Sequence, residues 1–206
     1  MSKKLYAAFV PLLAVVAFSA LPAVASATLT LNTGGVPLTA GAEIKGESSN
    51  LVFKAPGSTL KCASNIVKGT LTTNKKASDK VNLTEGAFTE PLAGGLCEST
   101  LGAARVATVG ATLPWTLTLA EAGTSTIKGE PVVEFEAEFV EFGITCFFES
   151  KNVKDTFNVG GALIDTITGQ KFTRNPASSV GCPENGELNG SFALTSGGAA
   201  IEATIP

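Results

Sequence analysis

The chain of 206 residues contains no histidine, and this absence excludes several kinds of chemistry at once. A histidine general base, the Ser-His-Asp and Cys-His nucleophile systems and histidine-ligated metal sites all require an imidazole ring. The only methionine and the only tyrosine, Met1 and Tyr6, lie in the first 27 residues, so the rest of the chain has neither. We therefore expect a protein that is not an enzyme and that uses no cofactor.

Positive charge is also in short supply. The chain has 15 basic residues against 18 acidic ones, and only Arg105 and Arg174 are arginines. Binding to nucleic acid depends on clustered positive charge that neutralises phosphates. A mildly acidic chain with so few arginines is a poor candidate for it, so we expect no nucleic-acid partner.

The N-terminal segment has the three parts of an export signal. Lys3 and Lys4 provide positive charge, residues 5–21 form an apolar run, and Ala25-Ser26-Ala27 is an A-x-A cleavage motif. This pattern predicts a signal peptide over residues 1–27, with cleavage before Thr28 and cleavage after Ala25 as the alternative. An uncleaved membrane anchor is the competing interpretation, but the apolar run is shorter than the ~20 residues that span a bilayer. We expect a secreted, extracellular protein with no membrane span after cleavage.

Loss of Lys3 and Lys4 with the signal would leave 13 basic residues against 18 acidic ones, a net charge of −5. All four cysteines remain in that mature part: Cys62, Cys97, Cys146 and Cys182. An even number of cysteines in an exported chain predicts two disulfides. A structural zinc site is the alternative, but the spacings of 35, 49 and 36 residues include no C-x-x-C pair. We expect no metal at these cysteines.

An internal duplication is the most informative feature of the sequence. Short landmarks recur in the same order, 83 to 88 positions apart. They are Thr28–Leu31 with Thr116–Leu119, Ile44–Glu47 with Ile127–Glu130, Cys62 with Cys146, Leu83 with Ile167, Phe88 with Phe172, and Cys97 with Cys182. This order predicts two β repeats, 28–113 and 114–206, packed as one compact body.

The duplication also bears on the disulfide pairing, for which four cysteines allow three connectivities. If one ancestral repeat was stable alone, it closed its own bridge, which gives Cys62–Cys97 and Cys146–Cys182. Pairings between the repeats also respect the symmetry and remain open. A bridge that closes a loop of this length contributes ~4 kcal/mol in the chain-entropy treatment.

The periodicity throughout the mature part is that of β-strands. Short segments rich in Val, Ile, Leu, Thr and Phe alternate in part and are separated by Gly, Asn, Ser and Pro clusters. In repeat one they are Thr28–Leu31, Asn50–Lys54, Asn65–Thr72, Lys80–Thr84 and Ala104–Val109; in repeat two they are Trp115–Leu119, Val132–Phe142, Ile144–Ser150, Val153–Val159, Ala162–Ile167, Leu188–Leu194 and Ala199–Ile205. We predict an all-β, antiparallel β-sandwich or barrel-like body built from two pseudo-repeats, with helix only in the signal peptide.

Two strand-like blocks, Ser58-Thr59-Leu60-Lys61-Cys62 and Leu113-Pro114-Trp115-Thr116-Leu117, carry a family resemblance together with the export signal and the TLTL and IKGE blocks. The chain resembles a group of small secreted proteins of Gram-positive bacteria that carry no assigned activity. The resemblance implies an all-β extracellular protein and supplies no catalytic residues.

Glu134, Glu136 and Glu138 are the strongest candidates for a functional site. They alternate with apolar residues, so on a strand the three carboxylates share one face. Such a row would suit a glycoside hydrolase, which needs two carboxyl groups ~5–10 Å apart, or a metal-ion site for a hard cation such as calcium. The competing interpretation, which we favour, is an amphipathic strand with a charged solvent face.

Trp115 is the only tryptophan, and a weaker candidate for ligand contact. Carbohydrate-binding surfaces present several aromatic faces, whereas a single Trp beside Pro114 is typical of a hydrophobic core. The sequence as a whole favours a secreted, non-enzymatic β protein with a binding or cell-envelope structural role. We expect an extracellular or cell-envelope partner, which the sequence does not identify.

Overall fold

The computed structural model describes residues 28–205, so the predicted signal peptide and its helix lie outside the described residues. The described chain is all-β and antiparallel, which confirms the predicted fold class. Its one helical element is a single 3-10 turn, η1 (Gly110–Thr112). Over residues 28–205 there is no helix of the length and apolar character that a membrane crossing requires.

Eighteen strands make up the described chain. Those of the first predicted repeat are β1 (Thr30–Thr33), β2 (Val36–Pro37), β3 (Glu43–Ser48), β4 (Leu51–Ala55), β5 (Ser58–Cys62), β6 (Ser64–Thr73), β7 (Ser78–Thr89), β8 (Cys97–Ser99) and β9 (Gly102–Thr108). Those of the second are β10 (Trp115–Ala120), β11 (Thr124–Lys128), β12 (Val133–Phe139), β13 (Ile144–Ser150), β14 (Val153–Phe157), β15 (Ile164–Arg174), β16 (Asn185–Ser196), β17 (Ala199–Ala200) and β18 (Glu202–Thr204).

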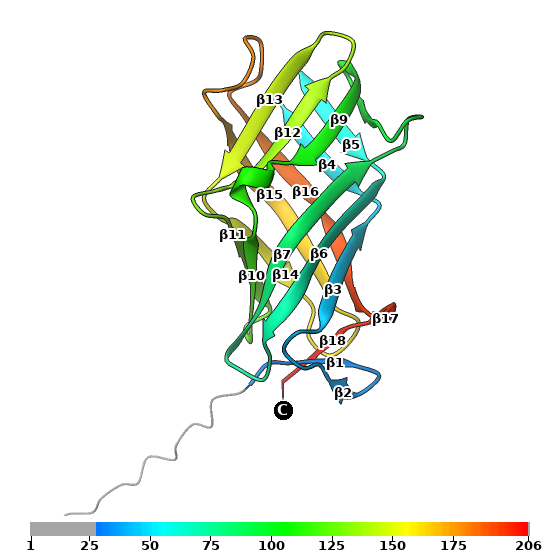
Figure 1. Ribbon diagram of the computed structural model, residues 1–206, viewed down its shortest axis with the longest axis vertical. Helices are drawn as coiled ribbons and strands as arrows, with labels where there is room; N and C mark the ends of the chain where they lie inside the picture. Colours follow the sequence, from blue (N-terminus) through cyan, green and yellow to red (C-terminus); the bar gives the residue numbers. More distant parts are fainter. Residues whose placement is uncertain (1–27, 206) are drawn as a thin grey trace, which may run out of the picture.

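The main sheet closes on itself twice, so the body is an elongated tube (Figure 1). In the lower part of Figure 1, the ring runs β16–β3–β6–β7–β10–β11–β14–β15 and returns to β16. In the upper part, it runs β16–β4–β5–β8–β9–β12–β13–β15 and again returns to β16. The long strands β15 and β16 belong to both rings, and β7 also pairs with strands of both. They join the two rings into one body.

A small second sheet lies across the lower end of the tube. It consists of β1 between β18 and β2, and both ends of the described chain lie there (Figure 1). Leu31 of β1 and Ala203 of β18 are paired in register and almost fully buried. The side chain of Asn74 holds this cap, because its amide accepts from the Leu31 N–H and donates to the Leu31 carbonyl, both at 2.9 Å. The cap therefore covers the lower end of the interior.

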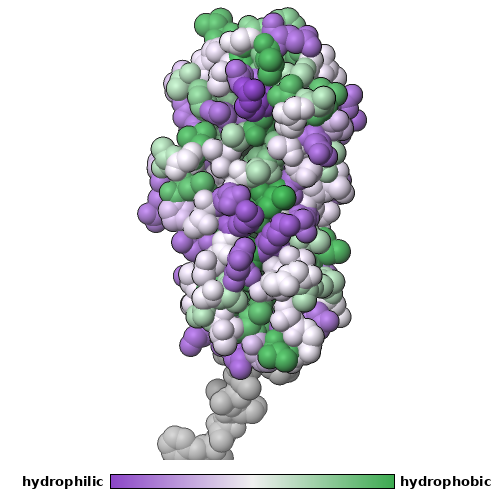
Figure 2. Space-filling view, turned by 45° about the vertical axis from the view of Figure 1, so that its right-hand side comes forward, coloured by the Kyte–Doolittle hydropathy of each residue, from purple (hydrophilic) through white to green (hydrophobic). Residues whose placement is uncertain are grey.

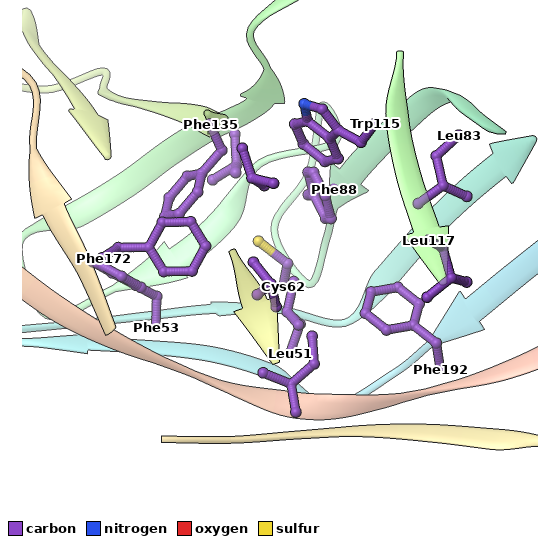
Figure 3. Close-up of a cluster of buried hydrophobic side chains, with 14 of the residues drawn as sticks. Leu51, Phe53, Cys62, Leu83, Phe88, Trp115, Leu117, Phe135, Phe172 and Phe192 are labelled. Atoms are coloured by element: carbon purple, nitrogen blue, oxygen red, sulfur yellow. The ribbon is translucent and has the colours of Figure 1, made fainter. Parts of the chain in front are cut away.

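Strand alternation determines which side chains enter the interior. In β10, Trp115, Leu117 and Leu119 are buried while the threonines between them are partly exposed. Buried side chains from both predicted repeats form a single hydrophobic core, part of which is drawn in Figure 3. Phe53 from the first repeat packs edge-on against Phe135 from the second, with ring centroids 5.2 Å apart. The two predicted repeats thus bury one another's apolar surface.

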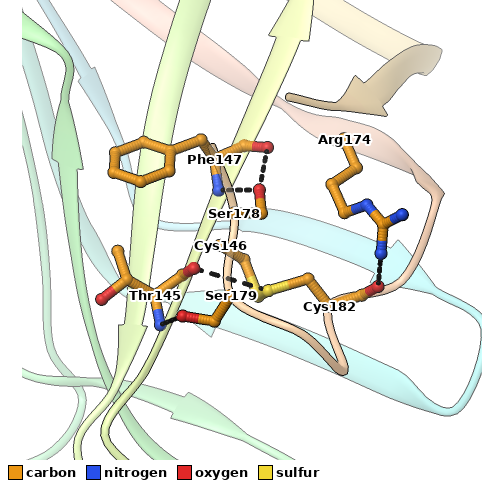
Figure 4. Close-up of a disulfide and its surroundings, with 7 residues drawn as sticks. All are labelled: Thr145, Cys146, Phe147, Arg174, Ser178, Ser179 and Cys182. Atoms are coloured by element: carbon orange, nitrogen blue, oxygen red, sulfur yellow. Dashed lines mark hydrogen bonds between the residues drawn. A yellow bond between two sulfur atoms is a disulfide. The ribbon is translucent and has the colours of Figure 1, made fainter. Parts of the chain in front are cut away.

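The two disulfides are Cys62–Cys97 and Cys146–Cys182, which confirms the predicted pairing. The first joins β5 to the start of β8. The second joins β13 to the segment after β15, and Figure 4 shows that segment along the edge of β13. There the hydroxyls of Ser178 and Ser179 accept from the N–H groups of Phe147 and Thr145, at 2.9 and 3.1 Å.

The burial of the matched positions agrees with the predicted duplication, which itself stays a prediction. Leu83, Ile167, Phe88 and Phe172 are all buried. The two TLTL blocks differ, however. The second lies within β10 in the main sheet, whereas the first enters β1 in the end cap. The first block lies 16 residues before its IKGE block and the second only 11, and the longer connection allows β1 to reach the end of the tube.

Candidate functional site

The glutamate row on β12 does lie on one face, but that face is the outer surface of the tube. Glu134 is nevertheless buried, against the expectation of a fully solvated charged face. The side-chain amide of Asn175 donates to Glu134 Oε1 at 2.8 Å and to Glu149 Oε2 at 3.0 Å, so the segment after β15 covers this carboxylate. Burial raises the pKa of Glu134, the hydrogen bond from Asn175 lowers it, and the nearby charges of Glu149 and Glu136 add a further rise.

The other two glutamates have separate surroundings. Glu138 pairs with Arg105, which lies opposite it on β9. Glu136 lies opposite Ala107 of β9 and Phe147 of β13, with no acidic neighbour in register. Within residues 28–205 no group of three or more acidic, cysteine or histidine side chains is placed to hold a metal ion. The row therefore has one carboxylate under a loop, one ion pair and one surface group, and they do not converge on a cleft.

Trp115 lies in the core, as its position beside Pro114 predicted. Its side chain is 6% exposed, and its indole N–H donates to Thr112 Oγ1 at 3.1 Å. In Figure 3 the ring points into the interior beside Phe88. Trp115 does not form an exposed platform, but it does line a cavity.

A cavity with a volume of about 90 Å³ lies among the buried side chains of the described molecule. Its wall includes Phe53, Phe135 and Phe172 in the upper ring and Leu117 and Leu194 in the lower ring. The lining residues come from strands of both rings, so the cavity lies in the middle of the tube. Figure 3 shows many of these side chains directed toward one another. Gly46 contributes no side chain to the lining. The other lining side chains are apolar, except that of Asp165.

Asp165 is the one acidic side chain in the cavity wall, and it lies in the lower ring. Side chains two positions apart on a strand share a face. On β11, β14 and β15, the residue two positions nearer the lower end of the tube than a cavity-lining residue is also buried. Below Ile127 of β11 lies Ser125, and below Val153 of β14 lies Asp155. On β15, Asp165 lies below Ile167. We call these three polar side chains, Ser125, Asp155 and Asp165, the polar floor. Only Asp165 lines the cavity itself, and Ser125 and Asp155 lie beside it on neighbouring strands.

The polar floor is buried and incompletely hydrogen-bonded. Ser125, Asp155 and Asp165 are 1%, 6% and 4% exposed. Ser125 Oγ donates to Asp165 Oδ1. Neither carboxylate oxygen of Asp155 has a hydrogen-bond partner among the described residues. A buried carboxylate without a partner is costly, since burial removes the hydration that stabilises its charge.

The pKa values of both carboxyl groups are raised accordingly. Burial and then the neighbouring charge of Asp165 raise the pKa of Asp155 to about 8. Burial raises the pKa of Asp165 to about 6, against the opposing effect of the hydrogen bond from Ser125. The pair therefore favours a protonated form at neutral pH, where two isolated aspartates would both be charged.

A third aspartate, Asp79 on β7, is also fully buried but lies outside the cavity wall. Its Oδ1 accepts from the Lys76 N–H at 3.3 Å, and its Oδ2 is unpartnered. Burial raises its pKa to about 6, and the hydrogen bond from Lys76 opposes that rise. All three aspartates of the described chain are therefore buried in the lower ring.

Sequence reasoning did not identify the polar floor. Asp155 stands between Val153 and Phe157 at strand spacing, and this pattern places a carboxylate on a buried face. That signal is local, whereas the meeting of Asp155 with Asp165 and Ser125 depends on the register of three strands. Comparisons of the chain with protein-family models, curated proteins and solved structures found no match.

Proposed function

We propose that the chain is an extracellular, non-enzymatic binding protein that encloses a small apolar ligand in its central cavity. The observation that carries the proposal is the cavity itself, which is walled almost wholly by apolar side chains and has a single carboxyl group, that of Asp165, in its wall. An engineered apolar cavity of ~150 Å³ holds a benzene ring. A space of about 90 Å³ fits a smaller group, such as a short unbranched alkyl chain.

The proposed extracellular location has three supports. Two disulfides are typical of oxidising compartments, and the described chain contains no helix suited to a membrane span. The predicted signal peptide over residues 1–27 adds the export route. The resemblance to small secreted proteins of Gram-positive bacteria is consistent with this location and names no ligand.

The surface supplies less support for a catalytic or metal-binding alternative. Glu134 and Glu138 are each engaged by a neighbour, Asn175 and Arg105, on the convex outer face. In Figure 2 hydrophilic and hydrophobic residues are intermixed over the visible face of the body. The geometry thus favours the interior over the surface as the place where a small ligand binds.

Trp115 provides a direct test, because it is the only tryptophan and it lines the cavity. Bromine atoms quench indole fluorescence on close contact. We expect short bromoalkanols, such as 3-bromopropan-1-ol, to quench Trp115 with a saturable dependence on concentration. The unbrominated alcohol should compete and restore the emission.

A matched pair of variants locates the binding. Leu188→Phe adds bulk to the cavity wall and should weaken saturable quenching, whereas Val180→Phe adds the same ring at a position that is 97% exposed and should not. Far-UV circular dichroism verifies that both variants are folded. Quenching that rises only linearly with concentration in the wild-type protein, as for collisions in solvent, would overturn the proposal.

A further inference from the structure

We propose that the polar floor formed by Ser125, Asp155 and Asp165 binds the ammonium group of a primary alkylamine whose alkyl chain lies in the cavity. This inference rests on the proposed function, since it assigns the chemical class of the ligand that the cavity would hold. It is argued from two buried carboxyl groups, those of Asp155 and Asp165, which lie among apolar side chains. That of Asp155 has no hydrogen-bond partner among the described residues.

The unpartnered side chain belongs to Asp155, which lies on the buried, inward face of β14. Asp155 is more than nine-tenths buried, and both of its carboxylate oxygens lack a partner within the described chain. It shares the inward face of β14 with Val153, which lines the cavity. Asp165, on the neighbouring strand β15, lines the cavity directly.

No cationic side chain of the described residues forms an ion pair with Asp155 or Asp165. The ion pairs found between residues 28 and 205 are Lys45–Glu47, Lys68–Glu85 and Arg105–Glu138, all at the surface. A buried carboxylate is ordinarily paired with a cation or binds a metal. A cation supplied by a ligand would provide the missing partner.

The number of donors and acceptors favours an ammonium group. A primary ammonium has three N–H donors and no acceptor. The polar floor offers a carboxylate oxygen of Asp155, a carboxylate oxygen of Asp165, and the Ser125 hydroxyl oxygen, whose own proton is donated to Asp165. A divalent metal is a poorer fit, since calcium takes six to eight oxygen ligands and the floor has two carboxylates.

The cavity wall above the polar floor determines the chemical character of the rest of the ligand. Ile127, Val153 and Ile167 lie immediately above the three polar residues and are apolar. A ligand with its charge at the floor would therefore place carbon atoms against this wall. An amphiphile with a terminal amine and a short saturated chain meets both requirements.

Binding of an ammonium group should also release a proton. The raised pKa of Asp155 keeps that carboxyl protonated at neutral pH, and a cation beside it lowers the pKa again. At pH 7 we expect close to one proton to leave for each amine bound. This readout depends on the carboxyl pair and does not arise from burial of an alkyl chain.

The test compares n-butylamine with n-butanol by isothermal titration calorimetry at pH 7, in buffers of different ionisation enthalpy. We expect the amine to bind at least about tenfold more tightly than the alcohol, as charge-assisted hydrogen bonds are stronger than neutral ones. The Asp155→Asn/Asp165→Asn double variant should lose this preference and the proton release. Asp79→Asn, which neutralises a buried carboxyl outside the cavity wall, should keep both.

The outcomes separate this inference from the proposed function. If butanol and butylamine bind the wild-type protein equally, or if the preference survives in the double variant, the ammonium site is wrong while the apolar cavity stands. If neither compound binds and Trp115 is not quenched by bromoalkanols, both proposals are wrong. The asparagine side chains match the aspartates in size, and the alcohol reports on whether the cavity of each variant remains intact.

Discussion

At the residue scale, the buried aspartates should dominate the pH dependence of stability. In the unfolded chain an aspartate titrates near 3.8, whereas in the folded protein burial raises the pKa of Asp155 to about 8 and that of Asp165 and Asp79 to about 6. Between these values the folded state binds more protons than the unfolded state. Stability therefore falls as the pH rises from about 4 through 8, and is greatest in mild acid.

The Asp155→Asn variant tests this directly. We expect its melting temperature to exceed that of the wild-type protein at pH 9 and to approach it at pH 4, because the amide removes a charge that has no partner. Thermal unfolding followed by circular dichroism across this pH range measures the difference. Glu187→Gln, an exposed change on β16, should leave the pH profile unaltered. A wild-type melting temperature that rises steadily from pH 4 to 9 would contradict the assignment.

At the scale of the elements, the alternation of β7 and β15 places Phe88 and Phe172 in the core. Replacing either with alanine should cost ~3–5 kcal/mol of unfolding free energy, because each leaves a cavity in packed surroundings. Phe142 is 61% exposed in the β12–β13 connection, and its replacement by alanine should change stability by less than ~0.5 kcal/mol. Urea unfolding of the three variants measures these values. Wild-type stability in Phe88→Ala or Phe172→Ala would show that the two positions are not equivalent.

The strands show how far a sequence pattern determines a fold. The alternation predicts β10, β12 and β14 as strands, and on β12 it also predicts which face is apolar. The predicted segments Ala162–Ile167 and Leu188–Leu194 are shorter than β15 and β16. On β15, Gly169, Gln170 and Lys171 interrupt the apolar pattern where the register with β16 is irregular. Strands β3 and β11 overlap the two IKGE blocks, Ile44–Glu47 and Ile127–Glu130, but neither is among the strands predicted from periodicity. Closure of the sheet depends on pairings such as β16 with β4, which are 130 or more positions apart and leave no local signal.

The candidate site shows the same difference between features that follow from local sequence and contacts between distant segments. Burial of Trp115 follows from its neighbours in the sequence, and the common face of Glu134, Glu136 and Glu138 follows from their spacing. The covering of Glu134 by Asn175 does not, since a loop 41 residues away makes the contact. The polar floor likewise requires three strands in register.

At the scale of the whole molecule, the two disulfides should contribute similarly to stability. Cys62–Cys97 and Cys146–Cys182 span 35 and 36 residues, so each removes a comparable amount of freedom from the unfolded chain. We expect the Cys62→Ala/Cys97→Ala and Cys146→Ala/Cys182→Ala double variants each to lose about 2–5 kcal/mol. Urea denaturation of both, without reductant, gives the comparison. If one double variant were as stable as the wild-type protein, that bridge would have no part in stabilising the fold.

The end cap has a mechanical consequence. Thr30 pairs with Thr204 at the outer end of the β1–β18 ladder, and the chain leaves both strands from that same end. A force that pulls the two ends of the chain apart would load these pairs one after another, as in opening a zip, and not all together in shear. The tube would begin to yield at its cap under a small load, however resistant its core is to heat.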